Sequence, residues 1–293
     1  MNYFLSIKES CIVVFLLLAG CHTTLHTESV IKRDTNALEL SLFYDLGDGR
    51  LDMSLERACL IASGVDTEKK MRTYLTKIDL LISRISHDTD IDKTSDPLAK
   101  AGKMFDWLQK NVNEGVYNDC YDIRDTFNLK VGNCLSYAIR FTILCRRFGI
   151  DIKNVFVPGH IYNMMVSNGQ IQYFEHTHSD GIVKKMDKYN PQKKVMRDEE
   201  LIAEIFLYKA RNANYDMKYE ESCKNCQSAL MCNPDDNRPV ILLLDNYIAR
   251  KNYEEAFQYL NEYLSRHPDD KKSLKNVYTL LKRLCKKEDD KIQ

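Results

Sequence analysis

Residues 122–150 read DIRDTFNLKVGNCLSYAIRFTILCRRFGI, a segment that places a cysteine directly after a helix-start signal. Asn133 is a good N-cap residue, and apolar side chains recur after it at helical spacing until Gly149, a residue type that commonly follows a helix end. We therefore predict a helix from about 133 to 149, with Cys134 in its first turn. There the unpaired N–H groups and the helix dipole favour thiolate over thiol, although most helix cysteines are merely packed.

The next part of the chain carries the periodicity of strands. Residues 154–157 form a short apolar run, and residues 160–167 and 170–177 flank Asn168-Gly169, a strong hairpin signal. The pattern predicts one short strand followed by a two-stranded hairpin.

The register of this hairpin brings a histidine and a carboxylate together. With the turn at the Asn-Gly pair, Tyr162 faces Glu175. Side-chain alternation then puts His160 on the same face as Glu175, within mutual side-chain reach. His176 and His178 fall on the opposite face in this register.

A cysteine at a helix start, with a histidine and an acid on adjacent strands, is an arrangement of nucleophile, base and orienting group. We predict that Cys134 attacks a carbonyl carbon, that His160 holds it as thiolate and protonates the leaving group, and that Glu175 orients and stabilises the imidazolium. The backbone N–H of Cys134 is the oxyanion donor that the sequence indicates.

Residues 122–150, then Val157-Pro158-Gly159-His160 and Phe174-Glu175-His176-Thr177, resemble the transglutaminase-like superfamily. The resemblance is best over residues 120–180, and the helices expected between about 50 and 115 fit a helical preface seen in one branch. It implies a papain-like core with cysteine on a helix and with histidine and an acid on successive strands. It also implies thiol acyl transfer, by transamidation or amide hydrolysis, on protein or peptide substrates.

Two positions depart from the family pattern. The acid is usually Asp and is Glu175 here, one methylene longer, and the usual aromatic residue after the cysteine is Leu135 here. Some relatives in the helical-preface branch lack the cysteine and are regarded as non-catalytic. This chain keeps Cys134, which favours an enzyme. The sequence leaves open whether water or an amine receives the acyl group.

The N-terminus resembles the signal of a bacterial lipoprotein. Residues 11–19 are an unbroken apolar run, too short to span a bilayer, and Leu18-Ala19-Gly20-Cys21 ends it like a lipobox. The resemblance implies a signal peptide at 1–20 and acylation of Cys21, with palmitate as one such chain, which would anchor the protein in the cell envelope. His22 stands where the inner-membrane retention signal is Asp, which favours an outer-membrane position facing the periplasm. The alternative is a plain signal peptide with a chance cysteine.

We expect an α+β fold, in which a papain/transglutaminase-like core has a helical N-terminal part and a small antiparallel sheet, and all-α helical repeats follow it. The expected parts are the signal peptide at 1–20, a polar tether at 21–45, a transglutaminase-like domain at 46–196 and helical repeats at 197–288. Within the core, periodicity predicts helices at 54–63, 68–85 and 98–111, and a polar loop at 87–96.

The C-terminal part repeats itself at an offset of 34 residues. Asn233-Pro234-Asp235-Asp236 recurs as His267-Pro268-Asp269-Asp270, and Tyr219-Glu220-Glu221 recurs as Tyr253-Glu254-Glu255. This period resembles the tetratricopeptide repeat, a helix-turn-helix unit. Two repeats and a closing helix would present a limited groove for a substrate or a protein partner.

Composition indicates a globular protein and excludes several classes. The 293 residues carry 42 Lys plus Arg and 42 Asp plus Glu, so there is no basic excess to indicate nucleic-acid binding. Only 11 Gly and 6 Pro disfavour turn-rich sandwiches and barrels. Of the 10 cysteines, Cys11 leaves with the signal and Cys21 takes lipid. The others could form disulfides in an envelope setting, with their pairing left open.

Two further patterns are weak indications of a metal site. Cys223-x-x-Cys226 with Cys232 could suggest zinc, but the repeat offset aligns the first two with apolar helix-packing positions. The His-x-His pair at 176 and 178 is more typical of a loop. We expect no metal and no cofactor.

Two functions fit these patterns. The first is a membrane-anchored, transglutaminase-like thiol enzyme that uses Cys134, His160 and Glu175. The second is a non-catalytic lipoprotein scaffold that binds protein partners through its helical repeats. We favour the enzyme, because the cysteine, histidine and acid fall into workable geometry.

Overall fold

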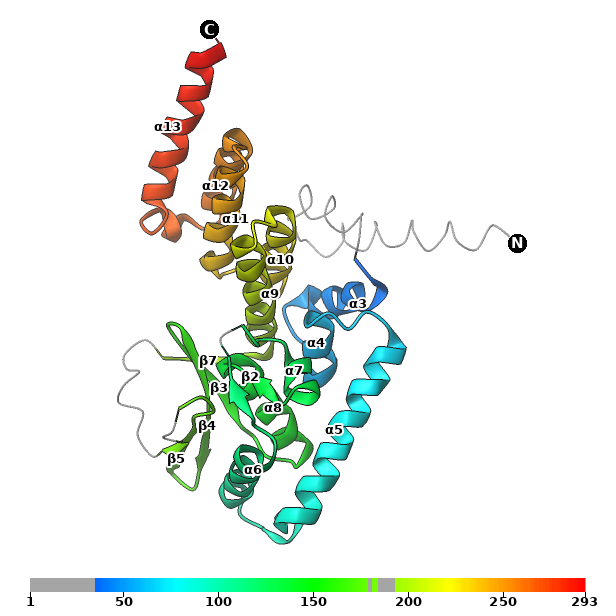
Figure 1. The fold of residues 1–293 in the computed structure, drawn as a ribbon. Coiled ribbons are helices and arrows are strands. Elements are labelled where there is room, and N and C mark those ends of the chain that lie inside the picture. Colours follow the sequence, from blue (N-terminus) through cyan, green and yellow to red (C-terminus); the bar gives the residue numbers. More distant parts are fainter. Residues whose placement is uncertain (1–34, 118, 179–180, 184–192, 293) are drawn as a thin grey trace, which may run out of the picture. The chain divides into compact units, whose positions relative to one another are not determined.

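Helices, a small antiparallel sheet and a pair of very short parallel strands make up the described chain, which is an α+β fold (Figure 1). The computed structural model describes residues 35–117, 119–178, 181–183 and 193–292. Residues 1–36 and residues 37–293 are separate units, and the second unit is described below. The signal peptide and its lipobox lie outside the described residues, and the boundary expected at residue 196 stays a prediction.

The first helices of this unit are α3 (Ala37–Asp45), α4 (Leu55–Ala62), α5 (Glu68–Thr89) and α6 (Pro97–Asn111). The two longer ones begin at polar caps: the side chain of Thr67 accepts the backbone N–H of Lys70, and that of Asp96 accepts the N–H of Ala99. Their buried apolar residues join one core cluster with those of α8. The helices predicted at 54–63, 68–85 and 98–111 are thus present.

Two bounds in this region differ from expectation. Residues 37–45, expected in a polar tether, form α3, because Leu38 and Leu42 are buried in the core. Helix α5 continues to Thr89, through the start of the expected loop. It ends at Asp90, which has the left-handed backbone conformation, φ 51°.

The cysteine segment forms α8 (Cys134–Arg147), which is buried along most of its length. It is preceded by β1 (Gly115–Val116), α7 (Ile123–Asn128) and β2 (Val131–Gly132), and the two short strands pair in parallel. Gly149 has a φ of 70°, and the backbone N–H of Ile150 donates to the carbonyl of Cys145, which closes the helix as predicted.

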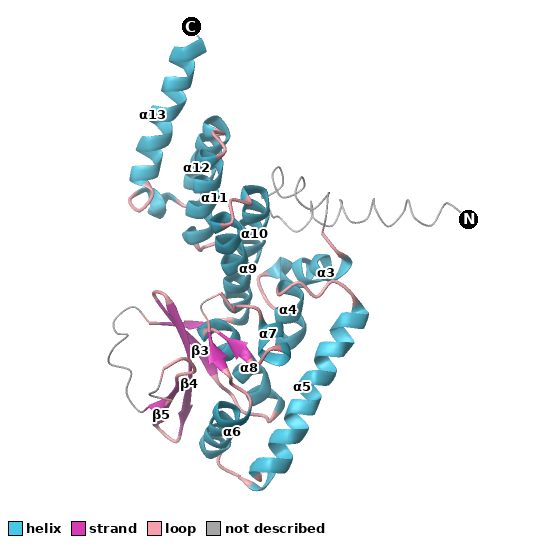
Figure 2. Cartoon of the chain, in the orientation of Figure 1, coloured by secondary structure: helices cyan, strands magenta, loops and turns pink. Residues whose placement is uncertain are grey.

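A five-stranded sheet packs against α8 (Figure 2). Its strands follow the order β6-β5-β4-β3-β7. Its strands are β3 (Lys153–Val157), β4 (His160–Ser167), β5 (Gln170–Phe174), β6 (Ile182–Val183) and β7 (Lys194–Met196). Every neighbouring pair is antiparallel. One face adds Ile161, Met165 and Phe174 to the core under α8. The opposite face carries a smaller apolar cluster that includes Tyr162 and Tyr173.

The hairpin has the predicted turn and register. Ser167 pairs with Gln170, and Asn168 and Gly169 have φ angles of 50° and 74°, as a two-residue turn of this kind requires. The second strand is shorter than expected, however, and ends at Phe174 instead of 177.

The strand ends at Phe174 because the side chain of the next residue, Glu175, binds the chain two residues further on. The Glu175 carboxylate accepts hydrogen bonds from the backbone N–H and the hydroxyl of Thr177, both at 3.0 Å. His178, which follows this local turn, is therefore no longer subject to strand alternation.

The remaining helices are α9 (Asp198–Tyr215), α10 (Tyr219–Cys232), α11 (Asn237–Ala249), α12 (Tyr253–Arg266) and α13 (Lys275–Ile292). Helices α10 and α12 begin at the two tyrosines that the 34-residue offset relates. Helix α9 is buried from Glu199 to Leu207 and contributes Leu201, Ile205 and Phe206 to the core around α8. The tetratricopeptide assignment itself stays a prediction.

Candidate functional site

Cys134 is the first residue of α8, and its side chain is only 9% exposed. Asn133 caps the helix: its Oδ1 accepts the backbone N–H of Leu135 at 2.9 Å and that of Ser136 at 3.1 Å. The Ser136 hydroxyl in turn accepts the N–H of Asn133 at 3.0 Å, which completes a capping box. The N–H of Cys134 makes no hydrogen bond to another described residue.

His160 and Glu175 meet across the hairpin, as the predicted register requires. His160 Nε2 lies 2.6 Å from Glu175 Oε2, and the two side chains are 11% and 2% exposed. His160 begins β4, and Glu175 directly follows β5. A pair of side chains that is largely buried from solvent, at this distance, makes a strong, charge-assisted hydrogen bond.

The thiol and the imidazole lie together. The Cys134 side chain is among the groups that raise the pKa of His160, which indicates that thiol and imidazole are close to each other. Glu175 holds Nε2 of the ring. The structure therefore brings together the three residues that the sequence singled out, in the order thiol, imidazole, carboxylate.

The electrostatics favour an imidazolium at this position. Burial by itself lowers the pKa of His160, but the hydrogen bonds with Cys134 and Glu175 and their negative charges outweigh it and raise the pKa to about 9. Burial likewise raises the pKa of Glu175, yet the contacts with His160 and Thr177 hold it below its ordinary value. Glu175 is thus an anion, and His160 a cation, across the neutral pH range.

The two other histidines of this region, His176 and His178, lie in different surroundings. His176 lies on the face opposite His160, as predicted, and is buried there with its Nε2 2.6 Å from Asn163 Oδ1. Burial lowers its pKa to about 3, so it is neutral. His178 was expected on the same face as His176, but its ring lies 5.8 Å from that of His160. The turn after Phe174 ends the alternation on which that expectation rested.

Tyr208 on α9 is a neighbour of the site that the sequence analysis missed. The charge of Cys134 is one of the causes that raise the pKa of its phenol, after burial. Its ring stacks on that of Tyr121, with centroids 5.8 Å apart and planes at 23°. No local pattern could have found Tyr208, because only tertiary packing relates α9 to the start of α8.

The cysteines that could have suggested a zinc site make packing contacts. Cys226 is buried against Ala210 and Leu243, and Cys223 packs against the same cluster. Over the part of the chain that the structure describes, no three His, Cys, Asp or Glu side chains are grouped to hold a metal ion. The following cysteines are present as thiols without a disulfide: Cys59, Cys120, Cys134, Cys145, Cys223, Cys226 and Cys232.

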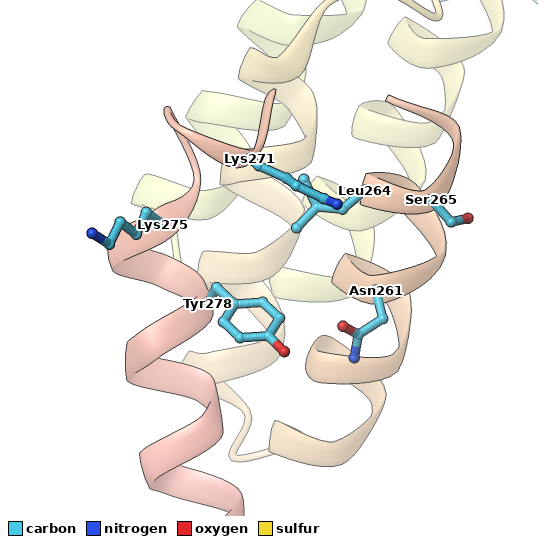
Figure 3. Close-up of a pocket in the computed structure, with 6 residues that line it drawn as sticks. All are labelled: Asn261, Leu264, Ser265, Lys271, Lys275 and Tyr278. Atoms are coloured by element: carbon cyan, nitrogen blue, oxygen red, sulfur yellow. The ribbon is translucent and has the colours of Figure 1, made fainter. Parts of the chain in front are cut away.

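A pocket of about 430 Å³ lies far along the chain from this site, between α12 and α13 (Figure 3). Its lining residues are Asn261, Leu264, Ser265, Lys271, Lys275 and Tyr278. Lys271 extends toward Leu264, whereas Lys275 points away from the gap. None of the three residues of the thiol site contributes to it.

Comparison with known proteins matches part of the chain. Residues 86–174 match the family model of the transglutaminase-like superfamily. The match runs from the end of α5 to the end of β5, so it includes Cys134 and His160 and stops one residue before Glu175. Searches of curated proteins and of solved structures gave no match. A helix of a length and hydropathy that could cross a bilayer was not found in the described ranges.

Proposed function

We propose that this protein is a thiol acyl-transfer enzyme of the transglutaminase-like kind, with Cys134 as nucleophile. The observation that carries the proposal is the hydrogen bond between His160 and Glu175, together with the influence of the Cys134 thiol on the pKa of the same imidazole. A cysteine that only packs in the core does not require an imidazole beside it. An ion pair with a purely structural role does not require a thiol beside it. The three groups together form a proton-transfer path next to a nucleophile.

The charges support an ion pair as the resting state. A pKa of about 9 keeps His160 protonated at neutral pH, and the first turn of α8 points its N–H groups and positive dipole end toward the Cys134 sulfur. Both influences favour the thiolate, which is the attacking form. Glu175 stabilises the imidazolium and fixes the ring through Nε2. A glutamate serves here in place of the usual aspartate.

In the first half-reaction, the Cys134 sulfur attacks the carbonyl carbon of an amide. A C–S bond forms and the C=O electron pair moves to the oxygen, where the Cys134 N–H can donate. The imidazolium of His160 then gives its proton to the amine nitrogen as the C–N bond breaks, which leaves a thioester and a neutral imidazole.

In the second half-reaction, neutral His160 takes a proton from water or from a primary amine as that group attacks the thioester. The C–S bond breaks, and the sulfur leaves as thiolate beside the restored imidazolium. The net reaction is hydrolysis in one case and transamidation in the other, on protein or peptide substrates.

The first test uses p-nitrophenyl acetate as a general acyl donor for the full chain. Trypsin releases Cys134 in the peptide 131–140, which contains no second cysteine, and Cys120 in the separate peptide 111–124. We expect acetylation of Cys134 to exceed that of the half-exposed Cys120 by about 100-fold or more, and to lose this advantage in His160→Ala. Equal acetylation of the two thiols would contradict the proposal.

We also propose that the enzyme is held at the cell envelope through lipid on Cys21, probed by labelled palmitate. Support comes from the lipobox-like Leu18-Ala19-Gly20-Cys21 and the apolar run before it. Labelling and recovery with the membrane fraction should both be lost in Cys21→Ser. Labelling that persists in this variant would contradict the anchor.

Partner binding through the C-terminal helices is a second candidate function. The pocket between α12 and α13, with Lys271 extending into it, supports this candidate (Figure 3). A scaffold would bind its partner equally well after Cys134→Ala, whereas an acyl-transfer enzyme would lose its covalent intermediate. Affinity capture with the two forms of the full chain separates the candidates.

A further inference from the structure

The carboxylate of the thiol site lies just beyond the end of the strand ladder. The ladder between β4 and β5 ends with Asn163 opposite Phe174, and Glu175 is the next residue. On the side away from β4, the backbone N–H of Glu175 donates to the Gly181 carbonyl at 2.8 Å. The 2.6 Å approach of its carboxylate to His160, the first residue of β4, therefore depends on what else ties this segment to β4.

The side chain of the following residue, His176, makes such a tie. Its Nε2 lies 2.6 Å from Oδ1 of Asn163 on β4, and both residues are buried. The amide nitrogen of Asn163 donates to two other oxygens, so its Oδ1 is the acceptor and the Nε2–H of His176 is the donor. The imidazole lies against the rings of Phe105 and Phe141, with centroids 5.1 and 5.2 Å away, which restricts its rotation.

Asn163 is itself fixed by bonds to two other elements. Its Nδ2 donates at 2.9 Å to Thr142 Oγ1 on α8 and at 2.9 Å to Asn154 Oδ1 on β3. All three side chains are buried. A polar group that left this network would be buried without a partner, so the network favours a single arrangement of its members. It thus joins α8, β3, β4 and the segment after β5.

We propose that His176 is a positioning residue, which holds the Glu175 carboxylate at His160 through its buried hydrogen bond to Asn163. The inference rests on the proposed function and deepens it, because it states what keeps the acid of the thiol site in place. Since His176 is anchored on one face of the sheet, the preceding side chain is directed to the other face, where it meets His160.

The test measures acetylation of Cys134 by p-nitrophenyl acetate in the full chain, as a ratio to acetylation of Cys120 in the same sample. His176→Leu keeps an apolar side chain of similar size among the aromatic rings and removes the donor. His176→Gln keeps a donor, because the amide nitrogen of glutamine can take the place of Nε2. We expect the ratio to fall about 10- to 100-fold in His176→Leu and to stay within about 3-fold of the wild type in His176→Gln.

Two control variants separate positioning from stability. Thr142→Val breaks another bond of the network and leaves the bond between His176 and Asn163, so it should lower the free energy of unfolding in urea without changing the ratio. His87→Leu, at a side chain that is 88% exposed, should change neither quantity. If His176→Leu does not fold, His176→Met gives the same comparison, because its flexible side chain adapts to the space.

An unchanged ratio in His176→Leu would overturn the inference. So would a fall that glutamine does not restore, or one that Thr142→Val reproduces, since the ratio would then follow the loss of packing or stability. Failure of the proposed function looks different, because wild-type Cys134 would then be acetylated no faster than Cys120.

Discussion

The glycine before the nucleophile offers a direct perturbation of the site. A Cβ added at Gly132 would lie 2.6 Å from the Ser136 Oγ and 2.9 Å from the Tyr137 Cε1, distances that real Cβ contacts do not reach. Neither neighbour can move freely. The Ser136 hydroxyl donates to the Cys120 carbonyl at 2.7 Å, and the Tyr137 hydroxyl donates to the Gly115 carbonyl at 2.5 Å.

The expected cost of Gly132→Ala follows from these contacts. Displacing Ser136 breaks the capping box, which is worth about 1 kcal/mol, and crowding a packed site adds about 1–3 kcal/mol. We therefore expect the free energy of unfolding to fall by about 2–4 kcal/mol. Because the same cap positions Cys134, alkylation of this thiol by iodoacetamide should slow as well.

The assay is urea unfolding followed by circular dichroism, together with alkylation at the peptide 131–140 under native conditions. Gly47→Ala is the matched control, because a Cβ there meets no atom within 4 Å. A decrease of less than about 0.5 kcal/mol in the free energy of unfolding of Gly132→Ala, with unchanged alkylation, would refute the reasoning. It would mean that the start of α8 accommodates the added Cβ without loss of stability.

Three further predictions concern charged groups. Glu175→Gln removes the anion that holds the His160 imidazolium, so Cys134 acylation should fall by about 10²–10⁴-fold. In the wild type, amide turnover should fall above about pH 9, because His160 loses its proton there. Rates measured across a pH series test both expectations. His176 has its pKa lowered to about 3 by burial, so the unfolded chain binds one more proton than the folded chain between about pH 3 and 6.5. Unfolding free energy should therefore drop toward low pH by up to about 1.4 kcal/mol per pH unit from this group, a slope that urea titrations should find missing in His176→Gln. Arg238→Gln leaves the buried Glu204 carboxylate without its ion-pair partner and should destabilise the fold by about 3 kcal/mol, and the double variant with Glu204→Gln should recover part of that loss in the same titrations.

Local chemistry explains why much of the site could be predicted. The start of α8 follows from Asn133 and its capping bonds, and the hairpin follows from a turn whose two residues adopt positive φ. Once the turn is placed, the strict alternation of strand side chains puts His160 beside Glu175. These features depend on neighbours in sequence or on one short register, so no knowledge of the remaining fold was needed.

Tertiary packing explains what could not be predicted. Nothing in the sequence around residue 208 relates it to Cys134, because the relation arises from how α9 lies on α8. His178 reached the His160 ring because the Glu175 carboxylate bonds Thr177 and ends the strand early. The predicted alternation is valid only as far as the ladder continues, and a side chain that competes for the backbone can end the ladder.

The most direct test of the central claim is the pH dependence of iodoacetamide alkylation at Cys134 in the full chain, read from the peptide 131–140, with Cys120 as internal control and His160→Ala as comparison. The ion pair predicts that Cys134 is alkylated faster than Cys120 at neutral pH and that this advantage is lost in His160→Ala. It predicts no change between the two proteins at Cys120, where burial raises the pKa. A Cys134 profile that coincides with that of Cys120, and that is identical in both proteins, would contradict the account.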